Sequence, residues 1–118
     1  MRQLVIDELT KEERDNLDNY MKRTLKQGGM MEGMFWLSIP DDLLAEAQQG
    51  HEKCGPFFFA LETFTFDVNK GTKKMIIELL VRSQSNLHCS CISYATRAQR
   101  DYLLGFVDTM LEAEHTRA

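Results

Sequence analysis

The feature that most constrains this fold is the stretch from Pro56 to Tyr94, where three runs of strand-forming residues are separated by two short polar segments. The first run, Pro-Phe-Phe-Phe-Ala-Leu-Glu-Thr-Phe-Thr-Phe-Asp, is rich in aromatic and β-branched residues, which suit a pleated, half-buried surface. Gly71 favours a tight hairpin turn because glycine readily adopts positive φ. The stretch therefore predicts a three-strand antiparallel meander. Its strands are expected at residues 56–67, 73–83 and 88–94.

The first turn also predicts the register of the hairpin. If residues 69–71 form the loop, Val68 faces Thr72 and the pairing continues along both strands. One face of the hairpin is then apolar without interruption, so we expect it to face the core. Its residues are Phe57, Phe59, Leu61, Met75, Ile77, Leu79 and Val81.

The opposite face of the hairpin, called here the mixed face, carries too many large apolar side chains to be left bare in water. We expect a helix, a protein partner or a second copy of the chain to cover part of it. The same register places Glu62 opposite Glu78. Such a pair could raise one carboxyl pKa and supply a general acid, or both groups could be solvated at a margin. The mixed face comprises Phe58, Ala60, Glu62, Phe64, Phe66, Ile76, Glu78, Leu80 and Arg82.

The segments around the meander predict helices that could cover it. Capping boxes at residues 10–13 and 96–99 mark the starts of two longer helices, each with one apolar stripe. Pro40 suits the first position of a short helix that should end by Gly50. Further strands are expected at residues 3–8, as an edge strand, and 33–39. The order predicts a single α+β domain over residues 1–118, with a three-strand antiparallel meander and one or two further strands, covered by two longer helices and one short helix.

The composition excludes several classes of protein. With 118 residues, 43% of them hydrophobic and 27% charged, the chain can bury a core of its own. A net charge of −4 argues against a nucleic-acid partner, because such binding depends on contacts to phosphates. No apolar run approaches the ~18 residues of a membrane span. The N-terminal segment has acidic residues where a signal peptide has its apolar core, so we expect a cytoplasmic protein without a disulfide framework.

One group of residues could carry chemistry. His51-x-x-Cys54 precedes the first meander strand, and Cys89-x-Cys91 lies within the third predicted strand. Cysteines two apart on a strand point to the same face, so with His51 and Cys54 they would supply the four ligands of a zinc site. His88 is a spare candidate. Neither spacing is a standard zinc motif.

The second turn decides between two positions for the cysteines. If residues 84–86 form the loop, Cys89 and Cys91 join the core face as small hydrophobic side chains. If Leu87 also belongs to the loop, they share the mixed face, where the loop carrying His51 and Cys54 could reach them. A reactive thiol, for example Cys54 with a histidine as its base, is a third alternative.

These observations leave three hypotheses for the function. The first is a non-enzymatic binding or assembly module, for example a homodimer, that uses the mixed face or the stretch from Met30 to Met34. The alternative is a small zinc-binding protein whose ligands are His51, Cys54, Cys89 and Cys91. An enzyme based on the carboxylate pair or on a reactive cysteine is the third, and no phosphate-binding glycine loop or nucleophile elbow is present.

Overall fold

The computed structural model describes residues 1–27, 32–86 and 88–114, and confirms an α+β fold. Within these residues the chain forms two α-helices, α1 (Lys11–Thr24) and α2 (Arg97–Ala113), and three short 3-10 helices, η1 (Asp41–Leu43), η2 (Glu46–Gln48) and η3 (Glu52–Cys54). The strands are β1 (Gln3–Leu9), β2 (Lys26–Gln27), β3 (Met34–Ser38), β4 (Phe57–Glu62), β5 (Phe66–Asp67), β6 (Thr72–Glu78), β7 (Leu80–Ser83) and β8 (Ser93–Tyr94). Neither α-helix in these residues is long and apolar enough to cross a membrane.

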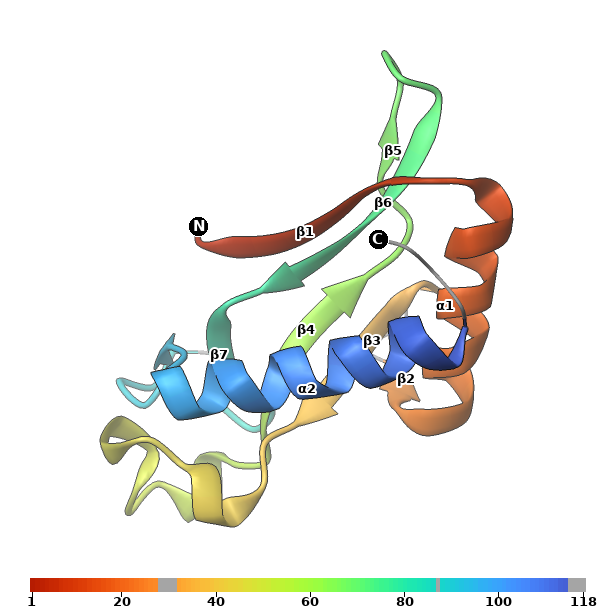
Figure 1. Ribbon diagram of the computed structural model, residues 1–118. Helices are drawn as coiled ribbons and strands as arrows, with labels where there is room; N and C mark the ends of the chain where they lie inside the picture. Colours follow the sequence, from red (N-terminus) through yellow and green to blue (C-terminus); the bar gives the residue numbers. More distant parts are fainter. Residues whose placement is uncertain (28–31, 87, 115–118) are drawn as a thin grey trace.

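The strands form an antiparallel sheet in the order β1-β6-β4-β3-β2 (Figure 1). Strand β5 pairs with β6, while β7 pairs with both β4 and β8. Strand β1 lies at one edge, as predicted, and β3 confirms the strand expected at residues 33–39. Of the stretch from Met30 to Met34, Met30 and Met31 lie outside the described residues.

The first two predicted strands of the meander are each interrupted. The first divides into β4 and β5, and the second divides into β6 and β7 at Leu79. The Leu79 N–H donates to the Arg2 carbonyl at 3.0 Å, and the Leu79 carbonyl accepts from Ala95 N–H at 2.8 Å. Leu79 thus bonds to segments on either side of the meander rather than to β4, and the strand changes partner there.

The predicted register is correct at one end of the hairpin and wrong at the other. Phe57 faces Ser83, as predicted, whereas Leu61 faces Ile77, a displacement of two residues. At the turn, Thr72 faces Asp67 instead of Val68, although Gly71 has the expected positive φ of 66°. The displacement of two residues between β4 and β6 leaves each side chain on its face, so the core face there is as predicted, whereas the displacement between β5 and β6 is one residue.

The third predicted strand is largely wrong. Only Ser93 and Tyr94 form a strand, and they pair with Val81 and Leu80. Apart from Leu87, which lies outside the described residues, residues 84–92 form a long loop instead of a short turn, and they include both cysteines of the Cys-x-Cys pair. Neither register proposed for the second turn is therefore correct.

The core lies between the core face of the sheet and the two α-helices. Both helices begin with the predicted capping boxes, in which the Thr10 and Thr96 hydroxyls accept from Glu13 and Gln99 N–H groups. Leu79 is partly buried against the core. The other predicted core-face residues, Phe57, Phe59, Leu61, Met75, Ile77 and Val81, are at most 3% exposed. From the helices, Leu17, Met21, Leu103, Val107 and Met110 join the same cluster.

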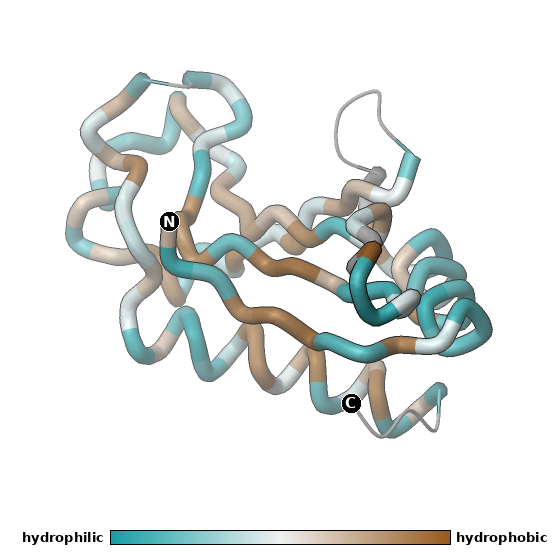
Figure 2. Tube along the Cα trace, turned by 90° about the horizontal axis from the view of Figure 1, so that it is seen from above, coloured by the Kyte–Doolittle hydropathy of each residue, from teal (hydrophilic) through white to brown (hydrophobic). Residues whose placement is uncertain are grey.

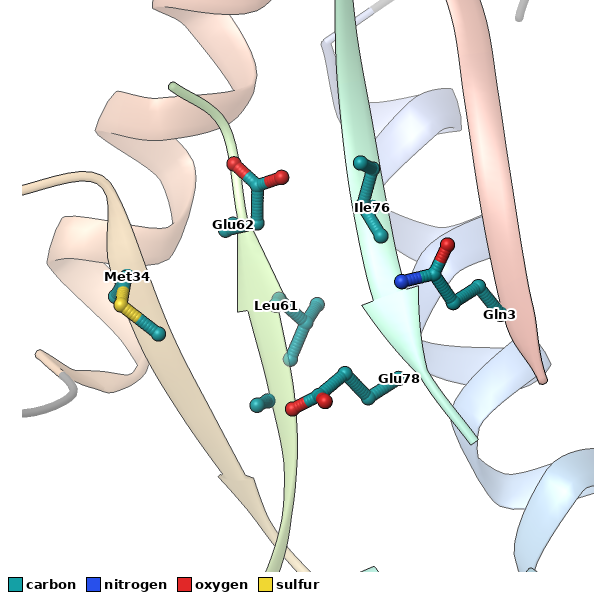
Figure 3. Close-up of a pocket in the computed structure, with 7 residues that line it drawn as sticks. Gln3, Met34, Leu61, Glu62, Ile76 and Glu78 are labelled. Atoms are coloured by element: carbon teal, nitrogen blue, oxygen red, sulfur yellow. The ribbon is translucent and has the colours of Figure 1, made fainter. Parts of the chain in front are cut away.

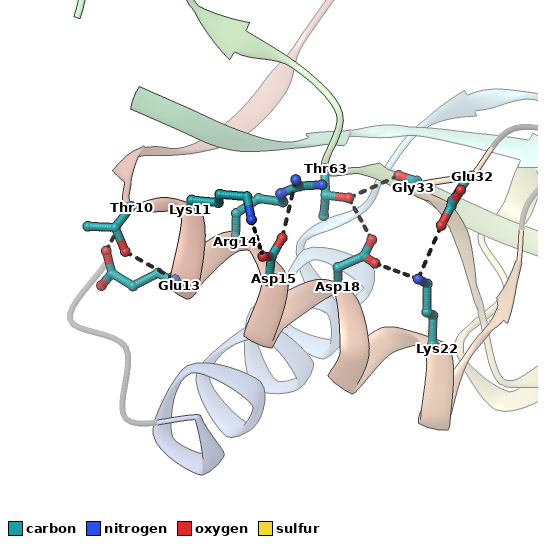
Figure 4. A network of polar contacts seen from close by, with 10 residues as sticks. All are labelled: Thr10, Lys11, Glu13, Arg14, Asp15, Asp18, Lys22, Glu32, Gly33 and Thr63. Atoms are coloured by element: carbon teal, nitrogen blue, oxygen red, sulfur yellow. Dashed lines mark hydrogen bonds and ion pairs between the residues drawn. The ribbon is translucent and has the colours of Figure 1, made fainter. Parts of the chain in front are cut away.

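A polar network centred on the buried residues Asp18 and Thr63 fixes α1 against the end of β4 (Figure 4). The Asp18 carboxylate accepts from the Thr63 hydroxyl at 2.8 Å and pairs with Lys22 at 3.1 Å. Lys22 reaches Glu32 at 3.4 Å, and Thr63 contacts the Gly33 carbonyl at 3.4 Å. Because buried charges must be paired to be tolerated, this network sets how α1 sits on the sheet.

The segment predicted as one short helix is a series of 3-10 helices instead. It is held to α2 by the buried side chain of Gln99, which donates to the Leu43 carbonyl and to Gln48 Oε1, both at 2.9 Å. Gln48 Oε1 also accepts from Ala45 N–H at 2.9 Å. These bonds fix the segment that leads into η3.

The mixed face of the sheet lies opposite the α-helices. Trp36 of β3 stacks on Phe58 of β4 with ring centroids 4.4 Å apart, and Phe58 is only 5% exposed. Phe64 is half exposed, at 49%. The Phe66 side chain lies outside the described part of the chain. The prediction that a partner or a second copy covers this face stays a prediction.

Candidate metal centre

Two segments far apart in the sequence form the candidate site. The first is the turn around η3, in which Cys54 N–H donates to the His51 carbonyl at 2.9 Å and Gly55 N–H to the Glu52 carbonyl at 3.2 Å. His51 is the N-cap residue of this turn, and its N–H donates to the Gln48 carbonyl at 3.1 Å. The turn therefore places His51 and Cys54 close together and fixes them to the segment held by α2.

The second segment is the turn at Cys89–Cys91. Ile92 N–H donates to the Cys89 carbonyl at 3.1 Å, and Cys91 N–H points at Cys89 Sγ at 3.4 Å. The prediction that these cysteines lie on one face of a strand is wrong. The tight turn nevertheless brings the two sulfurs together.

Hydrogen bonds join the two segments at the end of the sheet. The Ser83 hydroxyl donates to the Cys54 carbonyl, which also accepts from Ser85 N–H at 3.2 Å. The Ser85 hydroxyl donates to the Gly55 carbonyl at 2.8 Å, and Asn86 N–H donates to Ser83 Oγ at 3.0 Å. The end of β7 is thus fixed to the turn that carries His51 and Cys54.

The side chains of His51, Cys54, Cys89 and Cys91 converge in one cluster. Their ligand atoms, one from each residue, all lie within 4.8 Å of one another. One of these contacts joins Cys89 Sγ to His51 Nδ1 at 3.2 Å. Cys91 is fully buried, whereas the other three are partly buried. His88, the spare candidate, is exposed and lies outside the cluster.

The three thiols of the cluster differ in pKa. Hydrogen bonds from the Cys91 side chain and backbone, aided by Cys54 and by the nearby His51, lower the pKa of Cys89 to about 6. Burial, followed by the neighbouring cysteines, raises the pKa of Cys91 to about 12. The hydrogen bond to Cys89, followed by burial, raises the pKa of Cys54. The cluster therefore favours one thiolate, on Cys89, held by two thiol donors.

Comparison with known protein families, curated proteins and solved structures finds no match. The site must therefore be interpreted from its own chemistry. Three sulfurs and one imidazole nitrogen form a donor set that suits zinc and other thiophilic metals, and hard cations such as Mg²⁺ or Ca²⁺ prefer oxygen.

Asn86 belongs to the site, although the sequence indicated only a turn residue there. Its side-chain oxygen accepts from His88 N–H at 3.1 Å, and its side chain hydrogen-bonds the Cys54 thiol. Partners of this kind orient metal ligands and tune their charge. In the sequence, Asn86 is an amide residue three positions before Cys89. This spacing alone is too weak a pattern to predict a role at the site without knowledge of the fold.

The predicted carboxylate pair is not formed. Glu62 faces Ile76 across the sheet, and its carboxylate accepts from the N–H groups of Phe64 at 3.0 Å and Thr65 at 3.2 Å. Glu78 forms two bonds with Arg82, at 3.0 and 2.8 Å. Both glutamates line a pocket of about 250 Å³ on the mixed face (Figure 3), but each has its own partners. The geometry gives no support to a shared proton.

Proposed function

We propose that this protein is a small zinc-binding protein, in which His51, Cys54, Cys89 and Cys91 hold a single structural zinc ion. The observation that carries the proposal is the convergence of these four ligand atoms within 4.8 Å from two distant segments. Around a tetrahedral zinc, with bonds of about 2.0 to 2.3 Å, ligand atoms lie roughly 3.5 to 3.8 Å apart. Small side-chain movements would bring the cluster to that geometry.

The spacing favours one ion over an iron–sulfur cluster. In a two-iron cluster the ligands are divided between two metals, so ligands of different irons lie farther apart than those of a single ion. Here every pair lies within 4.8 Å, including pairs from different segments. The separation fits a single tetrahedral centre.

The ligand set also favours a structural role over a catalytic one. Catalytic zinc sites keep one position for water or substrate, whereas structural sites use four protein ligands. The four residues here would fill all positions and fix the loop of residues 84–92 to the turn at η3. The role of the ion would be to hold this end of the sheet together, and we infer a non-enzymatic protein.

The first test is the metal content of the purified chain, measured by native mass spectrometry on protein prepared without a histidine tag or chelator. We expect one zinc per chain. His51→Ala and Cys89→Ala should each lose the ion. Loss is expected because three ligands bind zinc far more weakly than four in a site that must be ordered on binding.

His88→Ala is the matched control, because His88 is a neighbouring histidine that lies outside the cluster. It should retain one zinc per chain. A chain that carries no metal even after zinc is supplied would refute the proposal, as would equal loss of zinc in the His51 and His88 variants.

A further inference from the structure

The candidate metal centre has one side that a small molecule in solution can reach. Cys54 and Cys89 are only partly buried, whereas Cys91 is fully buried in the core. The turn at Cys89–Cys91 and the turn at η3 both lie at the end of the molecule away from α1 (Figure 1, Figure 2). A reagent that attacks sulfur therefore meets Cys54 and Cys89 before Cys91, because the oxidation of cysteine depends on access to the sulfur.

Cys54 and Cys89 also lie close enough to be joined. Their sulfurs belong to the group of ligand atoms within 4.8 Å of one another, and the two side chains are hydrogen-bonded. The sulfurs of a disulfide are about 2 Å apart. A short movement of the Cys89 side chain and its loop would close the remaining gap.

Hydrogen bonds that do not involve a metal hold these two sulfurs near each other. The Ser85 N–H donates to the Cys54 carbonyl at 3.2 Å, and the Ser85 hydroxyl donates to the Gly55 carbonyl at 2.8 Å. The Ser83 hydroxyl donates to the same Cys54 carbonyl. The approach of Cys54 to Cys89 is therefore set by the folded chain and does not require the ion.

We propose, on the basis of the proposed zinc site, that Cys54 and Cys89 are an oxidation-sensitive pair, in which hydrogen peroxide converts the two zinc-bound thiolates into a disulfide and releases the ion. Cys91 stays reduced in the core. After oxidation only His51 and Cys91 remain as ligands, and a structural zinc site uses four. The pair would make zinc binding by this chain dependent on the presence of a peroxide.

The reaction takes place in two steps. Both sulfurs are thiolates while they bind zinc. One thiolate attacks an oxygen of hydrogen peroxide, the O–O bond breaks, and a sulfenic acid and a hydroxide ion are formed. The second thiolate attacks the sulfenic sulfur, the S–O bond breaks as the S–S bond forms, and a second hydroxide leaves. Two protons from solvent convert the hydroxides to water, the sulfurs have given two electrons to the peroxide, and zinc leaves unchanged as Zn²⁺.

The disulfide would replace the ion as the link between the two turns. Cys54 lies in the turn at η3 and Cys89 in the loop of residues 84–92, which are the segments that the ion would hold together. A cross-link between distant positions restrains the unfolded chain and so stabilises the folded one. The oxidised chain should therefore release its zinc without unfolding.

The test follows zinc and thiols together in the full chain, which is loaded with zinc and then treated with an excess of hydrogen peroxide. We expect one zinc per chain to be released to a colorimetric chelator, in step with the formation of one disulfide. Tryptic peptides 54–70 and 83–97 should be recovered as a cross-linked pair. Reduction with dithiothreitol and addition of zinc should restore the loaded chain. The urea midpoint of the oxidised chain should lie about 1 to 2 M above that of the reduced, metal-free chain.

Two variants identify the pair, and both are oxidised without metal because each lacks a zinc ligand. Cys91→Ala should form the same cross-link between the two peptides as the metal-free wild type does. Cys54→Ala should form no cross-link, and its Cys89 should gain oxygen atoms instead.

The loading step and the peroxide step give separate answers. A chain that binds no zinc would refute the proposed zinc site, and the zinc-releasing pair with it. A loaded chain that keeps its zinc in peroxide, or loses it without a cross-link between the two peptides, would overturn the pair and leave the zinc site standing. A disulfide between Cys89 and Cys91, found as the loss of two hydrogens within peptide 83–97, would also overturn the pair.

Discussion

Removal of the metal should destabilise the fold by the free energy with which the folded chain binds it. The ion would link His51 to Cys89, which are 38 positions apart in the chain. These ligands are far apart in the unfolded chain, so the ion binds the folded chain preferentially and stabilises it by about 4 kcal/mol when free zinc is about 1,000 times its dissociation constant. We take this value as the expected loss in the free energy of unfolding when the ion is removed from chain kept at that zinc excess.

The measurement is urea unfolding, followed by circular dichroism, of the zinc-loaded chain with and without a chelator. For a slope of about 2 kcal/mol per molar urea, a loss of about 4 kcal/mol lowers the midpoint by about 2 M. The metal-free chain should still fold, because most of the core consists of side chains from the sheet and both helices. In this respect it should differ from a zinc finger, which unfolds without its metal.

Two controls make the reasoning refutable. His51→Ala should have the lowered midpoint already and should not respond to the chelator, whereas His88→Ala should behave as the wild type does. If the chelator leaves the wild-type midpoint unchanged after the zinc has been shown to leave, the ion does not stabilise the fold and the structural role is wrong.

Three further predictions concern stability in the same urea assay. Asp18→Ala should lower the free energy of unfolding by about 2 to 3 kcal/mol, because the buried Thr63 hydroxyl loses a charged acceptor; a loss near zero would contradict this role. Phe59→Ala should cost about 3 to 5 kcal/mol by opening a cavity in the core, and an unchanged midpoint would show that the site collapses. Gln99→Ala should cost about 1 to 3 kcal/mol and speed hydrogen exchange in residues 43–48, since the Leu43 carbonyl loses its donor; unaltered exchange would exclude this link.

The features that were predictable from the sequence depend on neighbouring residues. Each capping box involves residues three positions apart, so Thr10 and Glu13, or Thr96 and Gln99, identify a helix start without reference to the fold. The alternation of side chains likewise identifies the core face, and it survives a register displacement of two residues. These parts of the prediction were correct because the residues that form the sequence pattern are also the residues that determine the local structure.

The errors arise where a distant partner decides the local structure. Leu79 leaves the ladder because Arg2 and Ala95, far away in sequence, take its backbone bonds. Leu80 then pairs with Tyr94, and the residues before Ser93 are released into a loop. No pattern within residues 73–94 specifies these partners, so a regular meander was the natural prediction and its last strand was wrong.

A core cysteine and a metal ligand were alternatives in the sequence, but the structure shows that one residue can satisfy the geometry of both. Cys91 is fully buried in the hydrophobic core, and its sulfur is also part of the four-residue cluster. The inner side of the cluster is therefore the core itself, while Cys54 and Cys89 lie only partly buried on its outer side. An ion held there would connect the loop of residues 84–92 directly to the packed interior. Loss of the ion should therefore destabilise the packing of the core beneath Cys91, as well as the loop.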